Sequence, residues 1–138
     1  MKIYVASSWR NEQQPVVVAE LRQAGHEVYD FKDPVAGFHW SMIDPDWQNW
    51  TPAEFKEALQ HPLAVKGYRL DHEGMLWADA CVLVMPCGRS AHLEAGWFIG
   101  AEKPCCILLS DGEPELMYRM ATLCSSIDEV RDFLETRQ

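Results

Sequence analysis

Short apolar runs alternate with amphipathic stretches along most of the chain. The runs at 2–6, 80–85 and 104–109 are typical of parallel strands that helices cover on both faces. The alternating segment 26–31 predicts another strand, and 120–124 predicts a short last one. The pattern therefore predicts a parallel sheet of about five strands.

Helices are expected between these strands. Pro15 fits only the first turn of its helix, where a missing N–H costs nothing. Thr51 and Glu54 have the spacing of a capping box, and so do Ser126 and Glu129. The expected helices span about 12–24, 51–62, 63–78, 91–101 and 126–136. Alternation of this kind predicts a doubly wound α/β sheet, and without repeats or linkers we expect one domain over 1–138.

The segment 32–50 differs from the rest of the chain. It combines Pro and Gly with three tryptophans, and it is too long for a simple connection. Trp40 is a candidate for a lid residue that stacks on a base. Satellite core and subunit contact are the alternatives for this segment.

Ligands of a doubly wound sheet bind beyond the carboxyl ends of its strands. The loop after the first strand carries Ser7, Ser8 and Arg10, which suit an anion or a ribose near a helix N-terminus. Simple N-capping by Ser8 or Asn11 is the alternative. This loop is neither a GxGxxG fingerprint nor a Walker A loop.

A second group of donors follows the strand 80–85. Gly88, Arg89 and Ser90 form a turn that could bind an anion or merely start a helix. Glu94 lies just beyond, alone among apolar and small residues of the helix 91–101. We expect this helix to be largely buried, with its glycines in close backbone packing. An ordinary first-turn glutamate is the alternative for Glu94.

Two aspartates lead into the strand 80–85. Asp79 adjoins the start of that strand and is expected at a turn, opposite the ligand edge. Asp71 lies about two helical turns earlier and can point back over the ligand edge. A solvent-facing helix acid is the alternative for Asp71.

Charge and cysteine content narrow the function classes. A formal net charge of -9 argues against a nucleic-acid polymer as partner. No apolar run approaches the roughly 18 residues that span a membrane. The short apolar stretch at the start, without a small-residue cleavage site, argues against a signal peptide. Five cysteines without a CxxC pair indicate a cytoplasmic protein without disulfides. No histidine has metal-ligand spacing with a cysteine or an acid, so no metal or cofactor is expected. Cys87 follows a strand and is a candidate nucleophile, but no histidine is obviously placed to activate it.

Three runs of the chain resemble the nucleoside 2-deoxyribosyltransferase family, which includes 2'-deoxynucleoside 5'-phosphate N-hydrolases. The runs are IYVASSWRN, LDHEGMLWADACVLVMP and SAHLEAGWFIGAEKPCCILL. They carry Asp71 and Asp79 at the family spacing, the sequence Glu94-Ala95-Gly96, and Lys103-Pro104 before a strand. The match covers the first ten residues and 70–109.

The resemblance implies a flavodoxin-like fold with Glu94 as nucleophile. It also implies that Asp71 holds or protonates the leaving base, that Tyr4 helps position Glu94, and that the chain forms a homodimer or a higher homo-oligomer. Gly88 stands where the transferases carry an acid, which favours a hydrolase, or a changed substrate, over base exchange.

The sequence thus predicts an enzyme acting on the N-glycosidic bond of a nucleoside or nucleoside 5'-monophosphate. Arg10, Arg89 or Ser90 would hold a 5'-phosphate. A non-catalytic module that binds a nucleotide or an ADP-ribose derivative is one alternative. The other is a flavodoxin-like interaction domain that uses the aromatic segment 38–50 as its partner surface.

Overall fold

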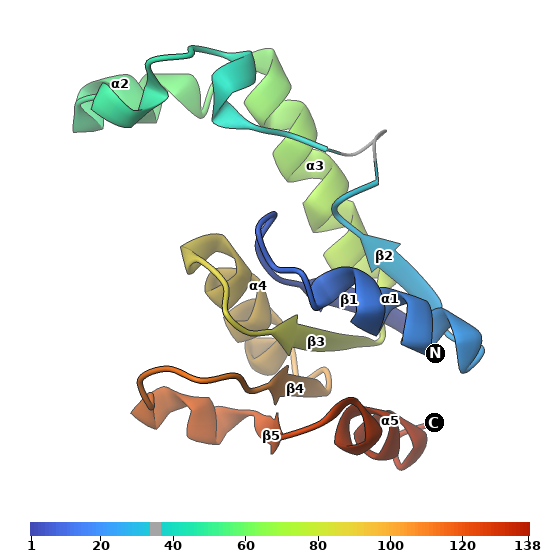
Figure 1. Ribbon diagram of the computed structural model, residues 1–138. Helices are drawn as coiled ribbons and strands as arrows, with labels where there is room; N and C mark the ends of the chain where they lie inside the picture. The colour runs from blue at the N-terminus through green and yellow to red at the C-terminus, as the bar shows by residue number, and fades with distance from the viewer. Residues whose placement is uncertain (34–36) are drawn as a thin grey trace. The chain divides into compact units, whose positions relative to one another are not determined.

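The computed structural model describes residues 1–33 and 37–138, so part of the expected 32–50 segment, at 34–36, lies outside the described residues. Within that range, five strands form one sheet in which neighbouring strands are parallel. The strands are β1 (Lys2–Ala6), β2 (Glu27–Asp30), β3 (Ala80–Val84), β4 (Cys105–Leu108) and β5 (Thr122–Cys124). Their order, β2-β1-β3-β4-β5, is the flavodoxin-like order and confirms the expected fold class (Figure 1).

The helices follow the expected plan with shifted ends. They are α1 (Gln14–Gln23), α2 (Pro52–Ala58), α3 (Pro62–Trp77), α4 (Arg89–Gly100) and α5 (Ile127–Glu135). Three 3-10 turns accompany them: η1 (Trp40–Met42), η2 (Trp47–Asn49) and η3 (Leu116–Met120). The helix expected from about residue 12 begins at Gln14, and the one expected from 91 begins at Arg89.

The chain divides into two compact units. The first consists of residues 1–30 and 77–138 and contains the sheet. The second consists of residues 31–76 and contains η1, η2, α2 and most of α3. One domain over 1–138 stays a prediction.

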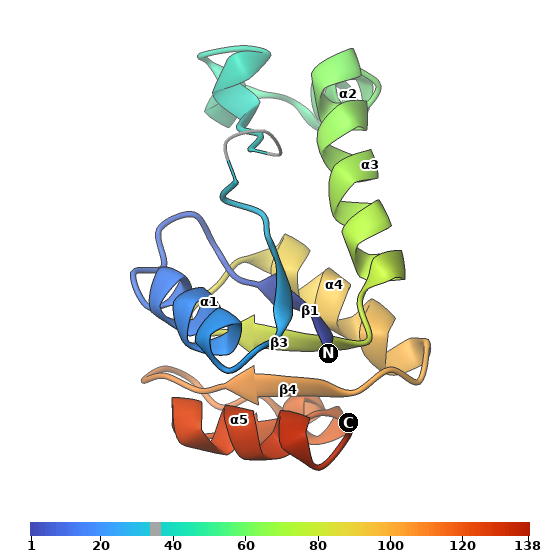
Figure 2. The same ribbon diagram turned by 90° about the vertical axis from the view of Figure 1, so that its right-hand side faces the viewer.

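Helices cover both faces of the sheet in the first unit. On one face, side chains of α1 and α5 join those of the strands in a buried core; this core includes Val17, Leu21, Val82, Val130 and Leu134. On the other face α4 packs on β1 and β3, and Figure 2 shows α1 in front of these strands and α4 behind them. Burying each large apolar side chain contributes about 1.5–3 kcal/mol, so this two-sided core fixes the strands on which the loops stand.

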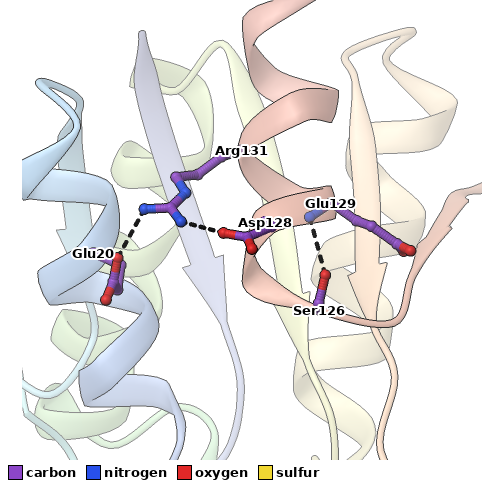
Figure 3. A network of polar contacts seen from close by, with 5 residues as sticks. All are labelled: Glu20, Ser126, Asp128, Glu129 and Arg131. Carbon is purple, nitrogen blue, oxygen red and sulfur yellow. Dashed lines mark hydrogen bonds and ion pairs between the residues drawn. The ribbon is translucent and has the colours of Figure 1, made fainter.

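A surface network joins α1 and α5 (Figure 3). Arg131 of α5 lies 3.0 Å from the Glu20 carboxylate of α1 and also pairs with Asp128 of its own helix. The Ser126 hydroxyl accepts from the backbone N–H of Glu129, as the capping-box spacing predicted. Because the Arg131–Glu20 pair is partly exposed, it contributes more to the register of the two helices than to stability.

The second unit contains a cluster of partly exposed aromatic rings. The Trp40 ring lies edge-on to Phe38 and Trp50, with centroids 5.0 and 5.7 Å apart, and it also contacts Phe55. Thr51 caps α2 in the predicted capping box with Glu54. Trp40 therefore packs on rings of its own unit while it stays partly exposed, and its interpretations as lid, satellite core or subunit contact stay open.

The expectation of a largely buried α4 is wrong. Leu93 is 76% exposed, and a Cβ added to Gly96 or Gly100 would meet no atom within 4 Å. Only one stripe of the helix, which includes Ala91, Ala95 and Phe98, is buried. The small residues of α4 therefore lie on its solvent side as well, and they do not indicate close packing there.

Candidate functional site

Glu94 is held by a tyrosine from the neighbouring strand β1. Glu94 is half-buried in α4, and the hydroxyl of the fully buried Tyr4 donates a hydrogen bond to its Oε2 atom. The Tyr4 ring stacks on Tyr29 of β2 at 5.1 Å and packs against Phe98 of α4 at 5.6 Å. Because two neighbouring rings restrict the buried Tyr4 ring, its hydroxyl is held in place and orients the Glu94 carboxylate.

Asn11 forms hydrogen bonds that connect the loop after β1 with the loop after β3, at the carboxyl edge of the sheet. Its Oδ1 atom accepts from the backbone N–H groups of Gln13 and Gln14, at 2.8 and 2.9 Å, where α1 begins. Its Nδ2 atom donates to the carbonyls of Val84 and Pro86, at 3.3 and 3.0 Å, where β3 ends. Asn11 is only 5% exposed, so a single amide joins the loops after β1 and β3. The sequence indicated its capping role but not its contact with β3.

Replacing Asn11 with Asp should destabilise the fold by about 2 kcal/mol. The carboxylate still caps α1, but an oxygen then faces two carbonyl oxygens in a buried place. Urea unfolding would measure the change, with Gln48→Glu, which adds the same charge at an exposed position, as the control. Equal unfolding midpoints for the two variants would contradict this account of Asn11.

The three predicted binding residues in the loop after β1 differ in their contacts and exposure. The Ser7 hydroxyl donates to the Val84 carbonyl at 2.8 Å, so its proton serves the contact between β1 and β3. Ser8 is half-buried, and its carbonyl accepts from the Asn11 N–H at 3.1 Å. Arg10 is exposed. Substrate binding by Ser7, Ser8 and Arg10 stays a prediction.

The second predicted donor group forms the start of α4. Gly88 is the N-cap residue and supplies no side-chain cap, while Arg89 and Ser90 are exposed in the first turn. Arg89 and Ser90 thus lie at the positive end of the helix dipole, where an anion is favoured. Their binding role also stays a prediction.

A histidine–tyrosine pair, which the sequence did not indicate, flanks the start of α4. The Nδ1 atom of His92 lies 2.8 Å from the Gly88 carbonyl, and its Nε2 atom lies 2.6 Å from the Tyr118 hydroxyl. A carbonyl can only accept, so Nδ1 donates to it, and in that tautomer Nε2 accepts the Tyr118 proton. The two rings also stack, with centroids 5.6 Å apart. The sequence offers one signal only: Tyr118 follows the predicted strand 104–109, and ligands of such sheets bind beyond the carboxyl ends of the strands.

Cys87 has a histidine nearby, contrary to expectation. Its Sγ atom lies 3.6 Å from Nδ1 of His92, but that nitrogen already carries the proton that it donates to Gly88. Burial, with a further contribution from the Glu94 charge, raises the pKa of the Cys87 thiol to about 11. A neutral thiol beside a protonated nitrogen is a poor nucleophile, so the geometry argues against Cys87 in that role.

Alkylation of Cys87 should report this raised pKa. Between pH 7 and 10 the iodoacetamide rate of the folded protein should rise about tenfold per pH unit without a plateau, because thiolate forms only near pH 11. Mass spectrometry of the modified peptide measures the rate, and the same peptide in denaturant should level off near pH 9 as the control. A plateau below pH 8 in the folded protein would restore the nucleophile interpretation.

The remaining candidate residues, Asp71, Trp40 and Asp79, do not belong to the loops after β1 and β3. Asp71 and Trp40 belong to the second unit, in α3 and η1, and their part in the site stays a prediction. Asp79 accepts from the Lys2 N–H at 3.0 Å, at the edge opposite the ligand edge, as its position in the sequence predicted.

The cysteines and the possible metal ligands of the described residues form no metal site. All five cysteines are free thiols. Over residues 1–33 and 37–138, no three His, Cys, Asp or Glu side chains gather as metal ligands would. In those same two ranges, every helix is too short or too polar to cross a bilayer.

Comparison with known proteins bears on the fold. No protein-family model matches the chain, and no curated protein matches it. A structure of a 2-deoxyribosyltransferase from Bacillus psychrosaccharolyticus matches 96% of this chain and 91% of its own, at 20% identity and a TM-score of 0.60. The chain shares the fold of that 2-deoxyribosyltransferase. A conserved protein from Enterococcus faecalis V583 is also similar, over 100% of this chain and 99% of its own, at 14% identity and a TM-score of 0.64. The fold that the family resemblance implied is thus confirmed.

Proposed function

We propose that the chain cleaves the N-glycosidic bond of a nucleoside or nucleoside 5'-monophosphate, with Glu94 as the nucleophile. The observation that carries the proposal is the Tyr4 hydroxyl bonded to the Glu94 carboxylate. A buried phenol, stacked on another ring, fixes the orientation of this half-buried carboxylate. A glutamate with a structural role alone does not need such a fixed orientation, whereas a nucleophile does. The likeness of the fold to a 2-deoxyribosyltransferase supports a nucleoside as the substrate.

The proposed chemistry is a retaining displacement. As the C1'–N bond breaks, positive charge develops on the sugar, and a carboxylate beneath the ring stabilises it. Glu94 then forms a bond to C1' while the bonding pair leaves with the base, giving a glycosyl ester. Water attacks C1' and returns a proton to the acid that protonated the base, while the ester bond breaks and the Glu94 carboxylate is regenerated. Tyr4 keeps the carboxylate in the orientation that this attack requires.

The departing base takes up a proton, and Asp71 is the acid that we propose for this step. Trp40 is proposed to stack on the base. Arg10, Arg89 and Ser90 are proposed to hold a 5'-phosphate, because exposed donors at helix starts suit an anion.

Hydrolysis is favoured over base exchange in this proposal. Gly88 occupies the position at which the resembling transferases carry an acid, and its carbonyl is engaged by His92. That position therefore offers no side chain to a second substrate. The similar enzyme of known structure is described as a transferase, so both outcomes belong in the assay.

A substrate panel tests the proposal. The protein is incubated with ribo- and deoxyribonucleosides and their 5'-monophosphates, with and without a second free base, and the products are separated by chromatography. We expect free base and free sugar in equal amounts, whereas a new nucleoside would indicate transfer. Ligand-induced stabilisation without any base release would instead support the non-catalytic binding module.

A further inference from the structure

The first turns of α4 are held from two flanks by two tyrosines. From β1, Tyr4 donates to Glu94, and from η3, Tyr118 donates to His92 two residues earlier in the helix. Residues two apart project from different sides of a helix. Gly88, at the start, provides no side-chain cap that could hold this end instead.

The contact between Tyr118 and His92 is well defined. Both ring nitrogens of His92 are used, one on Gly88 and one on Tyr118, and the rings stack. The Tyr118 hydroxyl also lies within donor reach of the Met85 sulfur, at 3.5 Å, between β3 and α4. A thioether is a weak acceptor, so we assign the single phenol proton to the shorter contact with His92 Nε2.

The protonation state of Tyr118 fits a donor. Burial raises the pKa of its phenol, with smaller contributions from Cys87 and Glu115, so the hydroxyl keeps its proton at neutral pH. The His92 ring therefore has a steady donor on the side of α4 that faces η3.

We propose that Tyr118 is a positioning residue for Glu94 and acts through His92. This inference rests on the proposed function. Fixing His92 on one side and Glu94 on another sets the rotation of α4 about its axis, and with it the aim of the carboxylate. A displacement of about 1 Å at a reacting group can cost about 10²-fold in rate, so a loosened helix start is enough to slow the reaction.

Substitutions at two positions separate this role from general packing. Tyr118→Phe removes only the hydroxyl. His92→Asn keeps a donor at the Nδ1 position for Gly88 but cannot reach Tyr118, whereas His92→Gln reaches the Nε2 position. We expect Tyr118→Phe and His92→Asn each to lower kcat about tenfold with KM unchanged, and the double variant to be no slower than either. His92→Gln should retain most of kcat.

Two measurements complete the test. The carbon-13 shift of the Glu94 carboxyl, which senses the Tyr4 hydrogen bond, should move in Tyr118→Phe and His92→Asn and stay in His92→Gln. Tyr68→Phe is the matched control, since Tyr68 is 69% exposed and its ring stack on His72 survives the change.

Wild-type kcat and an unmoved Glu94 shift in both single variants would overturn the inference, and so would fully additive losses in the double variant. Should Tyr118→Phe fail to fold, the comparison of His92→Asn with His92→Gln decides alone. If the wild-type protein releases no base from any substrate, the proposed function fails, and the Glu94 shift still tests the positioning by Tyr118.

Discussion

Glu94→Gln should lower kcat for base release by at least about 10³-fold, the scale of loss when a nucleophile is removed. Glutamine has the same shape and its amide oxygen can still accept from Tyr4, so the site should keep its geometry. What disappears is the negative charge that stabilises the sugar cation and the oxygen that bonds to C1'. Rates are measured with the best substrate of the panel, by chromatography of the liberated base.

Glu27→Gln is the matched control for this loss. Glu27 is exposed and is the first residue of β2, so it lies at the amino ends of the strands, opposite the ligand edge. It should turn over like the unchanged protein. A second observation comes from rapid acid quench of the wild-type reaction, in which the Glu94 peptide should gain the mass of the sugar residue. Turnover by Glu94→Gln at the wild-type rate would remove Glu94 from the proposed role.

The strands follow from local patterns, whereas their order was implied only by the family resemblance. The apolar runs that became β1, β3 and β4 are short and continuous, and such runs occur where helices cover both faces. Gly25, at a φ of 96°, ends the turn after α1 in a backbone conformation that glycine tolerates. These signals are local, so they can be read without knowing what lies across the fold.

The side-chain contacts at the candidate site, unlike the strands, join residues that are far apart in the sequence. Tyr118 and His92 are 26 residues apart, and the two partners of Asn11 in β3 and beyond are 73 and 75 residues away. No periodicity reports such contacts, because each depends on where a loop returns to the sheet. The contact between Tyr4 and Glu94 was expected only because of the family resemblance.

The error about α4 has a related cause. Small and apolar residues in a helix indicate burial only on average, and α4 places Leu93 and both of its glycines toward solvent. The sequence pattern gives the period of a helix but not how much of its surface the neighbours cover. For the same reason the separate unit 31–76 could not be inferred from composition alone.

Tyr4→Phe should lower kcat about 10- to 100-fold while costing only about 1 kcal/mol of stability. The ring keeps its contacts with Tyr29 and Phe98, so the packing under α4 is kept and one hydroxyl is lost. The carboxylate then loses its orienting donor and samples directions that do not lead to attack on C1'. Because the substrate binds through other groups, KM should change less than kcat.

Stopped assays for kcat and KM, together with urea unfolding, separate the two effects of Tyr4→Phe. Tyr68→Phe, which removes an exposed hydroxyl from the second unit, should match the wild-type protein in both measurements. A Tyr4→Phe protein with full kcat and reduced stability would mean that the hydroxyl contributes to folding alone. The buried tyrosine would then be explained by the core, and the orientation of Glu94 would need another cause.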